Sequence, residues 1–395
     1  MLLKGKHIVL GVTGSIAAYK IASLASMLVK RQADVTVIMT PNAVNFINPI
    51  TFESLTGNKC LVDTFDRNFQ FQVEHVALAK LADLFLVAPA SANVIAKAAH
   101  GIADDMLTTT LLACRCPRIF APAMNTRMYE NPIVQDNIQK LGDYGMEVIA
   151  PAAGYLACGD TGAGKMPEPE TLFEAIVKAL TPKDLAGKKV LVTAGPTQER
   201  MDPVRYISNH STGKMGYAVA RAAMLRGADV TLVSGVTALQ PPAGVKVVPV
   251  ISAADMAQAV KEAAPAQDII VKAAAVADYR PAVTADEKIK KKDGELTVLL
   301  ERTEDILAWL GANRREGQIL CGFSMETEHL LENSRAKLEK KKIDMIVANN
   351  LRQEGAGFGT DTNVVTLLTK EGAEELPLLS KEEVADRLLD RLMAL

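Results

Sequence analysis

Several side chains in the first half of the chain have the types needed for proton transfer at a bound ligand: His75, Asn125 and Cys158. A histidine titrates near neutral pH, a thiol can supply or remove a proton, and an asparagine amide can hold a carboxylate. Each residue also has an ordinary interpretation. A lone histidine at a helix start is usually structural, Asn125 is as readily a turn former, and Cys158 could be an incidental thiol in a flexible loop.

The glycine-rich segment after Cys158 imitates a phosphate-binding loop. Residues 159–165 match GxxxxGK, but Met166 stands where that motif needs a Ser or Thr hydroxyl for magnesium. Pro167 and Pro169 also keep a helix from following the motif at once. The preferred interpretation is therefore a glycine-rich flap that carries one thiol.

Small and hydrogen-bonding residues follow three predicted strands of this half. Backbone N–H groups at a helix start favour a phosphate, so the set outlines a crevice for a phosphorylated, planar ligand. The first turn lacks the full dinucleotide fingerprint GxGxxG, and a tight strand-to-helix turn is the alternative. The residues of the set are Gly14, Ser15, Ile16, Thr40, Ser91 and Asn93.

The second half concentrates donors and small residues in two segments. Residues 205–216 include Arg205 and Asn209 just before a predicted helix, and residues 273–278 end in the carboxylate of Asp278. A phosphate suits the helix start, and a carboxylate can bind a base, a sugar or magnesium. A polar capped loop is the alternative for the first segment.

Lysines add a third feature to the second half. Lys288 lies in the basic run 287–294, while Lys337 and Lys341 are four residues apart in a predicted helix over 330–342 and so share one face. Charge runs are usually solvated hairpins. A triphosphate nevertheless needs compensating cations, and these lysines are candidates for a basic wall around one.

The elements that must position these residues alternate between strand and helix. Near-continuous apolar strands separated by amphipathic helices imply parallel sheets that are covered on both faces. In the first half we expect strands at 7–10, 35–40, 84–88, 118–122 and 147–150, with helices at 16–30 and 133–141. In the second half we expect strands at 190–193, 230–233, 269–272, 319–322 and 345–348, a helix at 217–225, a hairpin of 364–368 with 375–378, and a final helix at 381–393.

The predicted strand and turn of residues 4–15 have a similar counterpart at residues 186–197, so the opening pattern of the chain occurs twice. The alternating pattern breaks between them, near residues 179–187, where Pro182 and Gly187 flank a polar stretch. We therefore expect an α/β protein with two doubly wound, mostly parallel-sheet, Rossmann-like domains in tandem, over residues 1–185 and 186–395.

Composition narrows the class of protein. The 395 residues carry a formal net charge of -2, which disfavours a general affinity for nucleic acid. No apolar run reaches the roughly 20 residues of a membrane span, and the first 14 residues lack a secretory signal. The five cysteines are odd in number and sparse, which argues against a disulfide framework. We interpret Cys114 and Cys116 as thiols at a helix end rather than as zinc ligands. We expect a cytoplasmic protein with no nucleic-acid or membrane partner.

Taken together, the motifs resemble a known pair of enzymes. The order and spacing in the first half are similar to those of the flavin-containing cysteine decarboxylases, in residues 11–16, His75, residues 89–93, residues 122–129 and the Cys158 flap. With the second half, the whole chain resembles the bacterial bifunctional phosphopantothenoylcysteine decarboxylases and phosphopantothenate–cysteine ligases of coenzyme A biosynthesis. Two conservative departures are Val94, where the family usually has Thr, and Tyr129, where it usually has Trp.

For the first domain the resemblance implies FMN-dependent decarboxylation. FMN takes electrons from the carbon that bears sulfur, the thioaldehyde then accepts the electrons released with carbon dioxide, and the flavin reduces the enethiol that results. His75 is implied to position or deprotonate the substrate, Asn125 to bind the departing carboxylate, and Cys158 to donate a proton. The implied FMN contacts are Gly14, Ser15, Ile16, Thr40, Ser91 and Asn93.

For the second domain the resemblance implies a CTP-dependent ligase. The carboxylate of 4'-phosphopantothenate attacks the α-phosphorus of CTP, and the amine of L-cysteine then attacks the acyl-cytidylate. Asn209 is implied to hold that intermediate, Arg205 the acidic substrate, and Lys288 the triphosphate. Mg2+ bridges phosphate oxygens, with Asp278 as a candidate ligand. The implied CTP pocket contains Ala273, Ala274, Ala275, Asp278, Lys288, Thr303, Glu304, Asp305, Ile306, Phe323, Lys337 and Lys341.

The resemblance also implies homo-oligomers, with decarboxylase trimers assembled into a dodecamer, flavin sites between subunits, and ligase dimers. Two alternatives stay open. The second half could bind a nucleotide only for regulation, or the chain could be a non-enzymatic flavin-binding regulatory subunit. His75 and the intact Cys158 flap weigh against the second alternative.

Overall fold

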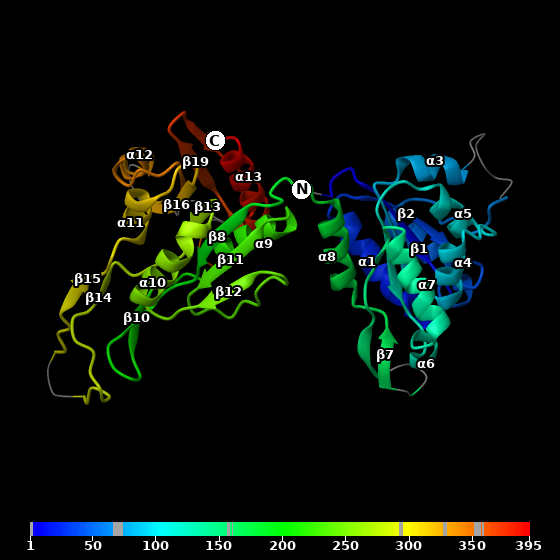
Figure 1. The fold of residues 1–395 in the computed structure, drawn as a ribbon, viewed down its shortest axis with the longest axis horizontal. Coiled ribbons are helices and arrows are strands. Elements are labelled where there is room, and N and C mark those ends of the chain that lie inside the picture. Colours follow the sequence, from blue (N-terminus) through cyan, green and yellow to red (C-terminus); the bar gives the residue numbers. More distant parts are fainter. Residues whose placement is uncertain are drawn as a thin grey trace. The chain divides into compact units, whose positions relative to one another are not determined.

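The chain forms two compact units, Met1–Thr181 and Pro182–Leu395, in a computed structural model (Figure 1). The structure describes residues 3–65, 74–155, 159, 161–291, 295–326, 330–350, 357 and 359–395. Cys158 lies outside the described residues. The division falls just before the boundary expected from the sequence, because Leu185 is buried in the core of the second unit. Among the described residues, no helix is both long and apolar enough to cross a membrane.

The first unit is built on a five-stranded sheet of order β2-β1-β3-β4-β5, with every pair parallel. All seven residues of β3 are buried, which is typical of a central strand covered on both faces. Its strands are β1 (His7–Val12), β2 (Asp34–Met39), β3 (Leu84–Ala90), β4 (Arg118–Pro122) and β5 (Glu147–Val148). Its helices are η1 (Ile16–Ala18), α1 (Tyr19–Lys30), η2 (Ala43–Asn45), α2 (Pro49–Thr56), α3 (Glu74–Leu81), α4 (Ala92–His100), α5 (Met106–Ala113), α6 (Thr126–Tyr129), α7 (Pro132–Asp143) and α8 (Pro169–Leu180).

The five predicted strands of this half are all present, and their observed ends lie within about two residues of the predicted ends. The helix predicted at 16–30 begins instead as the 3-10 turn η1 and becomes α-helical at Tyr19. Helices α4, α5 and α7 contribute to one core cluster with β1, β3 and β4, while α1 packs with α2 and α8. The doubly wound arrangement predicted from the alternating pattern is therefore confirmed.

The glycine-rich segment forms an antiparallel hairpin of β6 (Ala152–Tyr155) and β7 (Thr161–Lys165). The GxxxxGK stretch thus runs along a strand, and the next helix begins only at Pro169. A phosphate-binding loop connects a strand directly to a helix, so this geometry agrees with its rejection on the sequence.

The second unit is built on an eight-stranded sheet of order β12-β11-β8-β13-β16-β17-β19-β20. The first six strands are parallel, and β19 and β20 extend the sheet antiparallel. The main strands are β8 (Lys189–Ala194), β11 (Asp229–Ser234), β12 (Lys246–Pro249), β13 (Ile269–Lys272), β16 (Ile319–Glu326), β17 (Met345–Asn350), β19 (Val365–Thr369) and β20 (Ala373–Glu375). The short strands are β9 (Gln198–Arg200), β10 (Tyr206–Ser208), β14 (Tyr279–Pro281), β15 (Leu300–Arg302), β18 (Thr362–Asn363) and β21 (Leu379–Ser380).

Helices cover both faces of this sheet. One core cluster joins alternate residues of β8 with α9 (Lys214–Leu225) and α13 (Lys381–Met393). The other joins Leu191 with residues of α10 (Ala253–Ala263), α11 (Ile306–Asn313) and α12 (Leu330–Lys340). The turn η3 (Ala264–Ala266) follows α10. This alternation along β8 is what places a helix layer on each side.

Most predicted elements of the second half are present, with three corrections. The hairpin after residue 364 has its second strand at Ala373–Glu375, earlier than the predicted 375–378. The helix predicted at 217–225 begins three residues earlier, at Lys214, where Gly213 has a φ of 82°. Helix α12 ends at Lys340, so Lys341 lies beyond it, although its N–H still donates to the Lys337 carbonyl at 3.0 Å.

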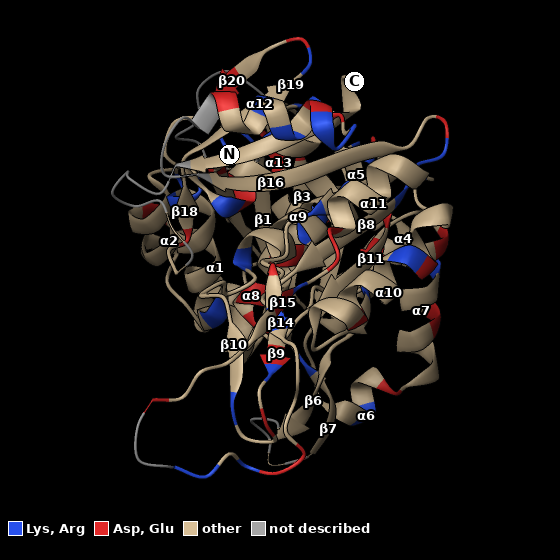
Figure 2. Ribbon diagram, turned by 90° about the vertical axis from the view of Figure 1, so that its left-hand side faces the viewer, with Lys and Arg blue, Asp and Glu red and all other residues tan. Residues whose placement is uncertain are grey.

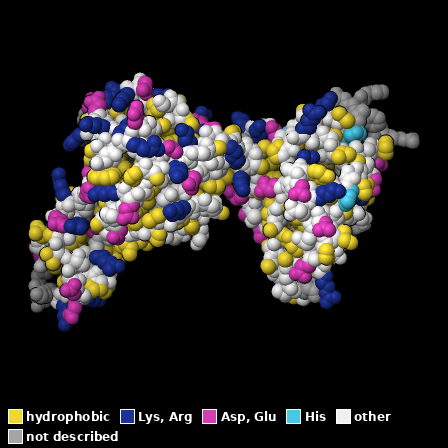
Figure 3. Space-filling model, in the orientation of Figure 1, with side chains coloured by type: hydrophobic (Ala, Val, Ile, Leu, Met, Phe, Trp, Pro, Cys, Tyr) yellow, Lys and Arg dark blue, Asp and Glu magenta, His cyan; other side chains and the backbone are white. Residues whose placement is uncertain are grey.

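Residues 282–291 and 295–299, which lie between β14 and β15, project from the second unit (Figure 1), and Figure 2 shows lysines among them in blue. Lys288 and Lys290 are exposed there. Elsewhere, on the face shown in Figure 3, Lys and Arg side chains are interspersed with Asp and Glu side chains over each unit.

Candidate active sites in the two units

In each sheet the strand order reverses once, between β1 and β3 in the first unit and between β8 and β13 in the second. Ligands of open α/β sheets bind outside the carboxyl ends of the strands at such a reversal. The predicted flavin residues follow β1, β2 and β3, and the predicted nucleotide residues follow β8, β13 and β16. Strand order thus brings each predicted set to one edge of its own sheet.

Thr13 ties the carboxyl ends of β1 and β3 together in the first unit. Its buried hydroxyl donates to the Pro89 carbonyl at 2.7 Å and accepts from the Ser91 N–H at 2.9 Å. Ser15 and Ser91 are the N-caps of η1 and α4, so each side chain satisfies a backbone donor at a helix start. The sequence motif contained Thr13, but its cross-strand role depends on the sheet.

Thr40 has a buried hydroxyl oxygen for which the described part of the chain provides no hydrogen-bond partner. An orphaned buried hydroxyl is costly unless a ligand or water satisfies it. Gly14 lies beside this residue's loop, and a Cβ at Gly14 would stand 2.9 Å from Asn42 Cβ. The remaining residues are accessible, since Ile16 is 57% exposed and Asn93 is exposed. This edge therefore fits a phosphorylated ligand that reaches Thr40 and lies against Ile16.

Asn125 is the N-cap of α6, and its Oδ1 accepts from the Arg127 N–H at 2.9 Å. The β6–β7 hairpin lies against this segment, because the Met124 N–H donates to the Gly164 carbonyl at 3.1 Å. A Cβ at Gly162 would come within 2.7 Å of the Thr126 side chain. The turn-forming role of Asn125 is thus present, and the glycines of the hairpin permit its close approach to the Asn125 segment.

His75 lies in the first turn of α3 and is half-buried. Helix α3 packs against α5, whereas α6, which follows Asn125, packs against β7 and α7. Figure 1 shows α3 and α6 at opposite ends of the first unit. A single copy of the chain therefore does not bring the His75 helix to the Asn125 segment.

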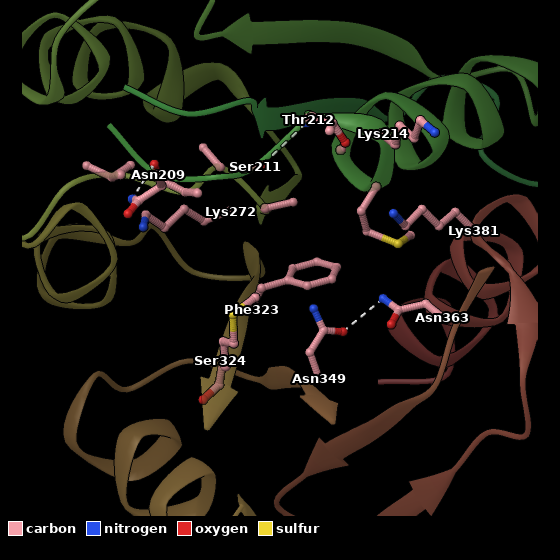
Figure 4. A pocket seen from close by; sticks show the side chains of 18 of the residues that line it. Asn209, Ser211, Thr212, Lys214, Lys272, Phe323, Ser324, Asn349, Asn363 and Lys381 are labelled. Carbon is pink, nitrogen blue, oxygen red and sulfur yellow. Dashed lines mark hydrogen bonds between the residues drawn. The ribbon is translucent and has the colours of Figure 1, made fainter. Parts of the chain in front are cut away.

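The second unit contains a cavity of about 340 Å³ at the β8–β13 reversal (Figure 4). Predicted residues in its lining are Asn209, Ala273, Ala274, Ala275, Asp278 and Phe323. Its other described lining residues are Ser211, Thr212, Gly213, Lys214, Met215, Gly216, Lys272, Val276, Ser324, Met325, Asn349, Gly357, Asn363 and Lys381.

The wall formed by residues 273–278 is held by hydrogen bonds to the end of β8. Thr193 Oγ1 accepts from the Ala274 N–H at 3.1 Å, and the Gly195 carbonyl accepts from the Ala275 N–H at 3.0 Å. Asn209 joins the same wall, since its Nδ2 donates to the Ala275 carbonyl at 3.0 Å. The predicted residues Asn209 and Ala275 are therefore direct neighbours, although they are far apart in the chain.

Cations gather where α9 begins. Lys214 pairs with Asp361 at 2.7 Å, and the buried Lys381 donates to the carbonyls of Gly357 at 3.1 Å and Thr360 at 2.6 Å. Burial lowers the pKa of Lys381, and the like charge of Lys214 adds to that effect against the opposing carboxylate of Asp361. Two lysines beside the N-terminus of a 12-residue helix favour an anion.

The other predicted residues of this half are absent from the described lining. Arg205 donates to Asp202 and to the Ile289 carbonyl, which follows the exposed Lys288. Thr303 is attached to the rim, because its N–H donates to the Asp278 carbonyl at 3.0 Å. Asp305 is the N-cap residue before Ile306 and pairs with Lys341 at 2.9 Å. Glu304 pairs with Lys261 at 2.6 Å, and Lys337 lies on α12.

Several lining residues were missed by the sequence analysis. Lys272 did give a signal, because a charged residue at the carboxyl end of an apolar strand is unusual. Asn363 and Lys381 gave none. Asn363 lies in the short strand β18, which pairs with β21, and Lys381 is the first residue of the last helix. The Asn363 Nδ2 donates to Asn349 Oδ1 at 2.9 Å (Figure 4).

Fold and sites together define a protein with two α/β units, each with a candidate ligand site at the carboxyl edge of a doubly wound sheet. Family models agree with this division. Residues 2–181 match the Flavoprotein family, and residues 185–395 match the C-terminal domain of the DNA/pantothenate metabolism flavoproteins.

Curated relatives match the whole chain. The coenzyme A biosynthesis bifunctional protein CoaBC of Bacillus subtilis (strain 168) is 48% identical and covers 100% of this chain and 98% of its own. The protein of the same description from Escherichia coli (strain K12) is 42% identical with the same coverage. A crystal structure of the C-terminal domain of a CoaBC protein is 44% identical, with a TM-score of 0.46, and covers 53% of this chain and 96% of its own.

The chain belongs to the family of coenzyme A biosynthesis bifunctional proteins CoaBC. It is therefore a bifunctional enzyme of coenzyme A biosynthesis that acts on small molecules, with a flavoprotein decarboxylase unit followed by a ligase unit. The resemblance inferred from the motifs is confirmed.

Proposed function

We propose that the second unit uses CTP to join L-cysteine to 4'-phosphopantothenate through an acyl-cytidylate, and that the first unit uses FMN to decarboxylate the product to 4'-phosphopantetheine. The observation that carries the proposal is the cavity at the β8–β13 reversal. Asn209, Ala275, Asp278 and Phe323 converge on it from three separate segments of the chain.

Charge in and around the cavity supports a nucleoside triphosphate. The start of α9, with Lys214 and Lys381 beside it, suits the phosphates, and Asp278 in the same lining suits the base, the ribose or Mg2+. In this proposal Asn209 holds the acyl-cytidylate next to the Ala275 carbonyl. The residues expected to complete the CTP pocket are Ala273, Ala274, Thr303, Glu304, Asp305, Ile306, Phe323, Lys337 and Lys341.

The position of Lys288 supports a separate role for this residue, which is to stabilise the negative charge of the triphosphate. Arg205 is anchored to the backbone of Ile289, so the guanidinium group that would receive the acidic substrate and the Lys288 ammonium belong to one assembly. Lys288 is exposed in the isolated chain, and it would reach the triphosphate as negative charge develops on it.

For the first unit, the residues after β1, β2 and β3 fit FMN. Gly14, Ser15, Ile16, Ser91 and Asn93 lie at this edge, and the orphaned hydroxyl of Thr40 gains a partner when a polar ligand binds. FMN, when bound, supplies a reversible two-electron acceptor. In this proposal Asn125 holds the substrate carboxylate, His75 positions or deprotonates the substrate, and Cys158 donates the final proton.

We also propose that the decarboxylase site forms between copies of the chain. The His75 helix and the Asn125 segment lie apart within one unit, and an assembly brings them together if each copy contributes one of them. Decarboxylase trimers within a dodecamer, ligase dimers and a cytoplasmic location stay predictions.

A coupled incubation tests the proposed function. The full chain is mixed with 4'-phosphopantothenate, L-cysteine, CTP and Mg2+, and 4'-phosphopantetheine is followed by mass. We expect product with CTP and little with ATP or without nucleotide, accompanied by pyrophosphate. Nucleotide binding without pyrophosphate release would favour a purely regulatory second unit.

Two variants separate the activities. Lys288→Gln should abolish acyl-cytidylate formation and leave decarboxylation of supplied 4'-phosphopantothenoylcysteine intact. Cys158→Ser should keep FMN bound and accumulate the oxidised enethiol. Loss of both activities in folded Lys288→Gln protein, or normal product from Cys158→Ser, would contradict the separate residue roles.

A further inference from the structure

Lys272 is the last residue of β13, and it places an ammonium group in the wall of the ligase cavity. Its neighbours along the strand, Ile269, Ile270 and Val271, are fully buried core residues. The described part of the chain provides neither a hydrogen bond nor an ion pair to Lys272 Nζ. A cation at the carboxyl end of a central strand that lacks a protein partner is costly, and a ligand in the cavity can offset that cost.

The charges around Lys272 cancel. Lys341, Asp305 and Asp278 are the charged groups that act on its ammonium, so the local set holds two cations and two carboxylates. Asp305 is already paired with Lys341 at 2.9 Å and caps α11. Burial lowers the pKa of Lys272 to about 8, the charge of Lys341 lowers it as well, and Asp305 and Asp278 raise it.

The two ends of the cavity therefore differ in charge. Figure 4 shows the ammonium groups of Lys214 and Lys381 on the side of α9 and that of Lys272 on the opposite side. Lys214, Lys381 and the start of α9 outweigh the single carboxylate of Asp361, which suits phosphates. The neutral set around Lys272 suits an uncharged part of the ligand that offers both acceptors and donors.

Cytosine matches this arrangement better than uracil does. The cytosine ring offers acceptors at O2 and N3 beside the donor N4 amino group, while uracil offers a donor at N3 and an acceptor in place of the amino group. An ammonium donates to the acceptor edge, and neighbouring carboxylates accept from an exocyclic amine. Lys272 and Asp278 both line the cavity, and together they supply such a donor and acceptor.

We propose that Lys272 donates a hydrogen bond to the O2/N3 edge of the nucleotide's cytosine and thereby contributes to the choice of cytosine over uracil. The inference rests on the proposed use of CTP by this cavity. It assigns Lys272 to base recognition and leaves the phosphates to the α9 side.

Affinities of the full-length protein for CTP, UTP and inorganic tripolyphosphate test the assignment. We expect Lys272→Met to weaken CTP binding about tenfold, to affect UTP much less, and to leave tripolyphosphate binding unchanged. Lys246→Met, at an exposed lysine of β12 outside the cavity, is the matched control and should change none of the three.

Thermal unfolding without nucleotide distinguishes recognition from a structural role. Because Lys272 makes no described hydrogen bond, Lys272→Met should unfold at a temperature no lower than the wild type. Unchanged CTP affinity, equal losses for CTP and UTP, or loss of tripolyphosphate binding would each overturn the assignment. A wild-type protein without preference for CTP would instead count against the proposed function.

Discussion

Asp202 and Arg205 form a bidentate pair in which the guanidinium Nε and NH2 donate to one carboxylate oxygen at 2.9 and 2.6 Å. The Asp202 side chain has no exposed surface, while that of Arg205 is 40% exposed. The same carboxylate accepts from the Ile289 N–H at 3.1 Å, and Arg205 donates to the Ile289 carbonyl at 2.7 Å. One buried carboxylate thus holds both the candidate substrate guanidinium and the backbone beside Lys288.

Removal of the Asp202 charge should therefore impair the ligase selectively. We expect Asp202→Asn to lower ligation about tenfold or more, because a neutral amide cannot accept all of these hydrogen bonds, and to leave decarboxylation of supplied substrate unchanged. Asp268→Asn is a suitable control, since Asp268 accepts from Arg315 and from the Lys189 N–H away from the cavity. Equal losses in both variants would argue against a specific role of Asp202.

The contribution of Asp202 to stability should depend on pH. Burial alone would raise the pKa of Asp202, but the hydrogen bonds from Arg205 and from the N–H groups of Val204, Arg205 and Ile289 hold it well below its usual range. A carboxyl with a lowered folded-state pKa stabilises above its unfolded pKa, and that stability is lost as the pH falls. The gap in urea midpoint between wild type and Asp202→Asn should shrink below about pH 4. A gap that stays constant with pH would contradict this origin.

The Thr40 hydroxyl offers a test of the flavin site. Thr40→Val should weaken FMN binding about tenfold, yet it should not destabilise the flavin-free protein, because the hydroxyl has no described partner. Flavin retained through purification, read from its visible absorption, measures the first effect. Thr110→Val is the control, since Thr110 Oγ1 donates to the Met106 carbonyl at 2.7 Å, and it should reduce stability while leaving flavin content unchanged. Full flavin content in Thr40→Val would remove Thr40 from the site.

Gly216 permits the close approach of α9 to β8 beside the cavity. A Cβ there would lie 2.5 Å from Ala194 Cβ and 2.9 Å from the Thr193 carbonyl oxygen. We expect Gly216→Ala to displace the first turn of α9, to destabilise the second unit by about 1–3 kcal/mol, and to lower ligase activity. Hydrogen exchange of the α9 amides measures the displacement.

Gly142 provides the matched control for that substitution. It is also a helical glycine, but a Cβ there would meet nothing within 4 Å. Gly142→Ala should stabilise the first unit by about 0.5–1 kcal/mol through helix propensity. Unaltered α9 exchange in Gly216→Ala would show that the helix can accept a methyl group at this contact.

The strand and helix pattern was predicted well for physical reasons. Strands such as β4 and β13 have the predicted bounds, because a buried parallel strand requires an unbroken apolar run that is visible in any window of the chain. The final helix also has its predicted bounds, and Ser380 caps it in a capping box with Glu383. The predicted bounds were wrong mainly at irregular helix ends. The turn η1 precedes α1 within the helix predicted at 16–30, and Lys341 lies beyond the end of α12.

The sequence by itself determined the two α/β units and the family, and it predicted which segments carry chemistry, because hydrophobic periodicity and motif spacing are local properties of the chain. Only the tertiary structure decided that Lys272, Asn363 and Lys381 line one cavity, and that Asp202 rather than solvent holds Arg205. That these distant residues lie together depends on the strand order across the β8–β13 reversal and on the antiparallel extension of the sheet by β19. Strand order is a global result of packing, which spacing along the chain does not encode.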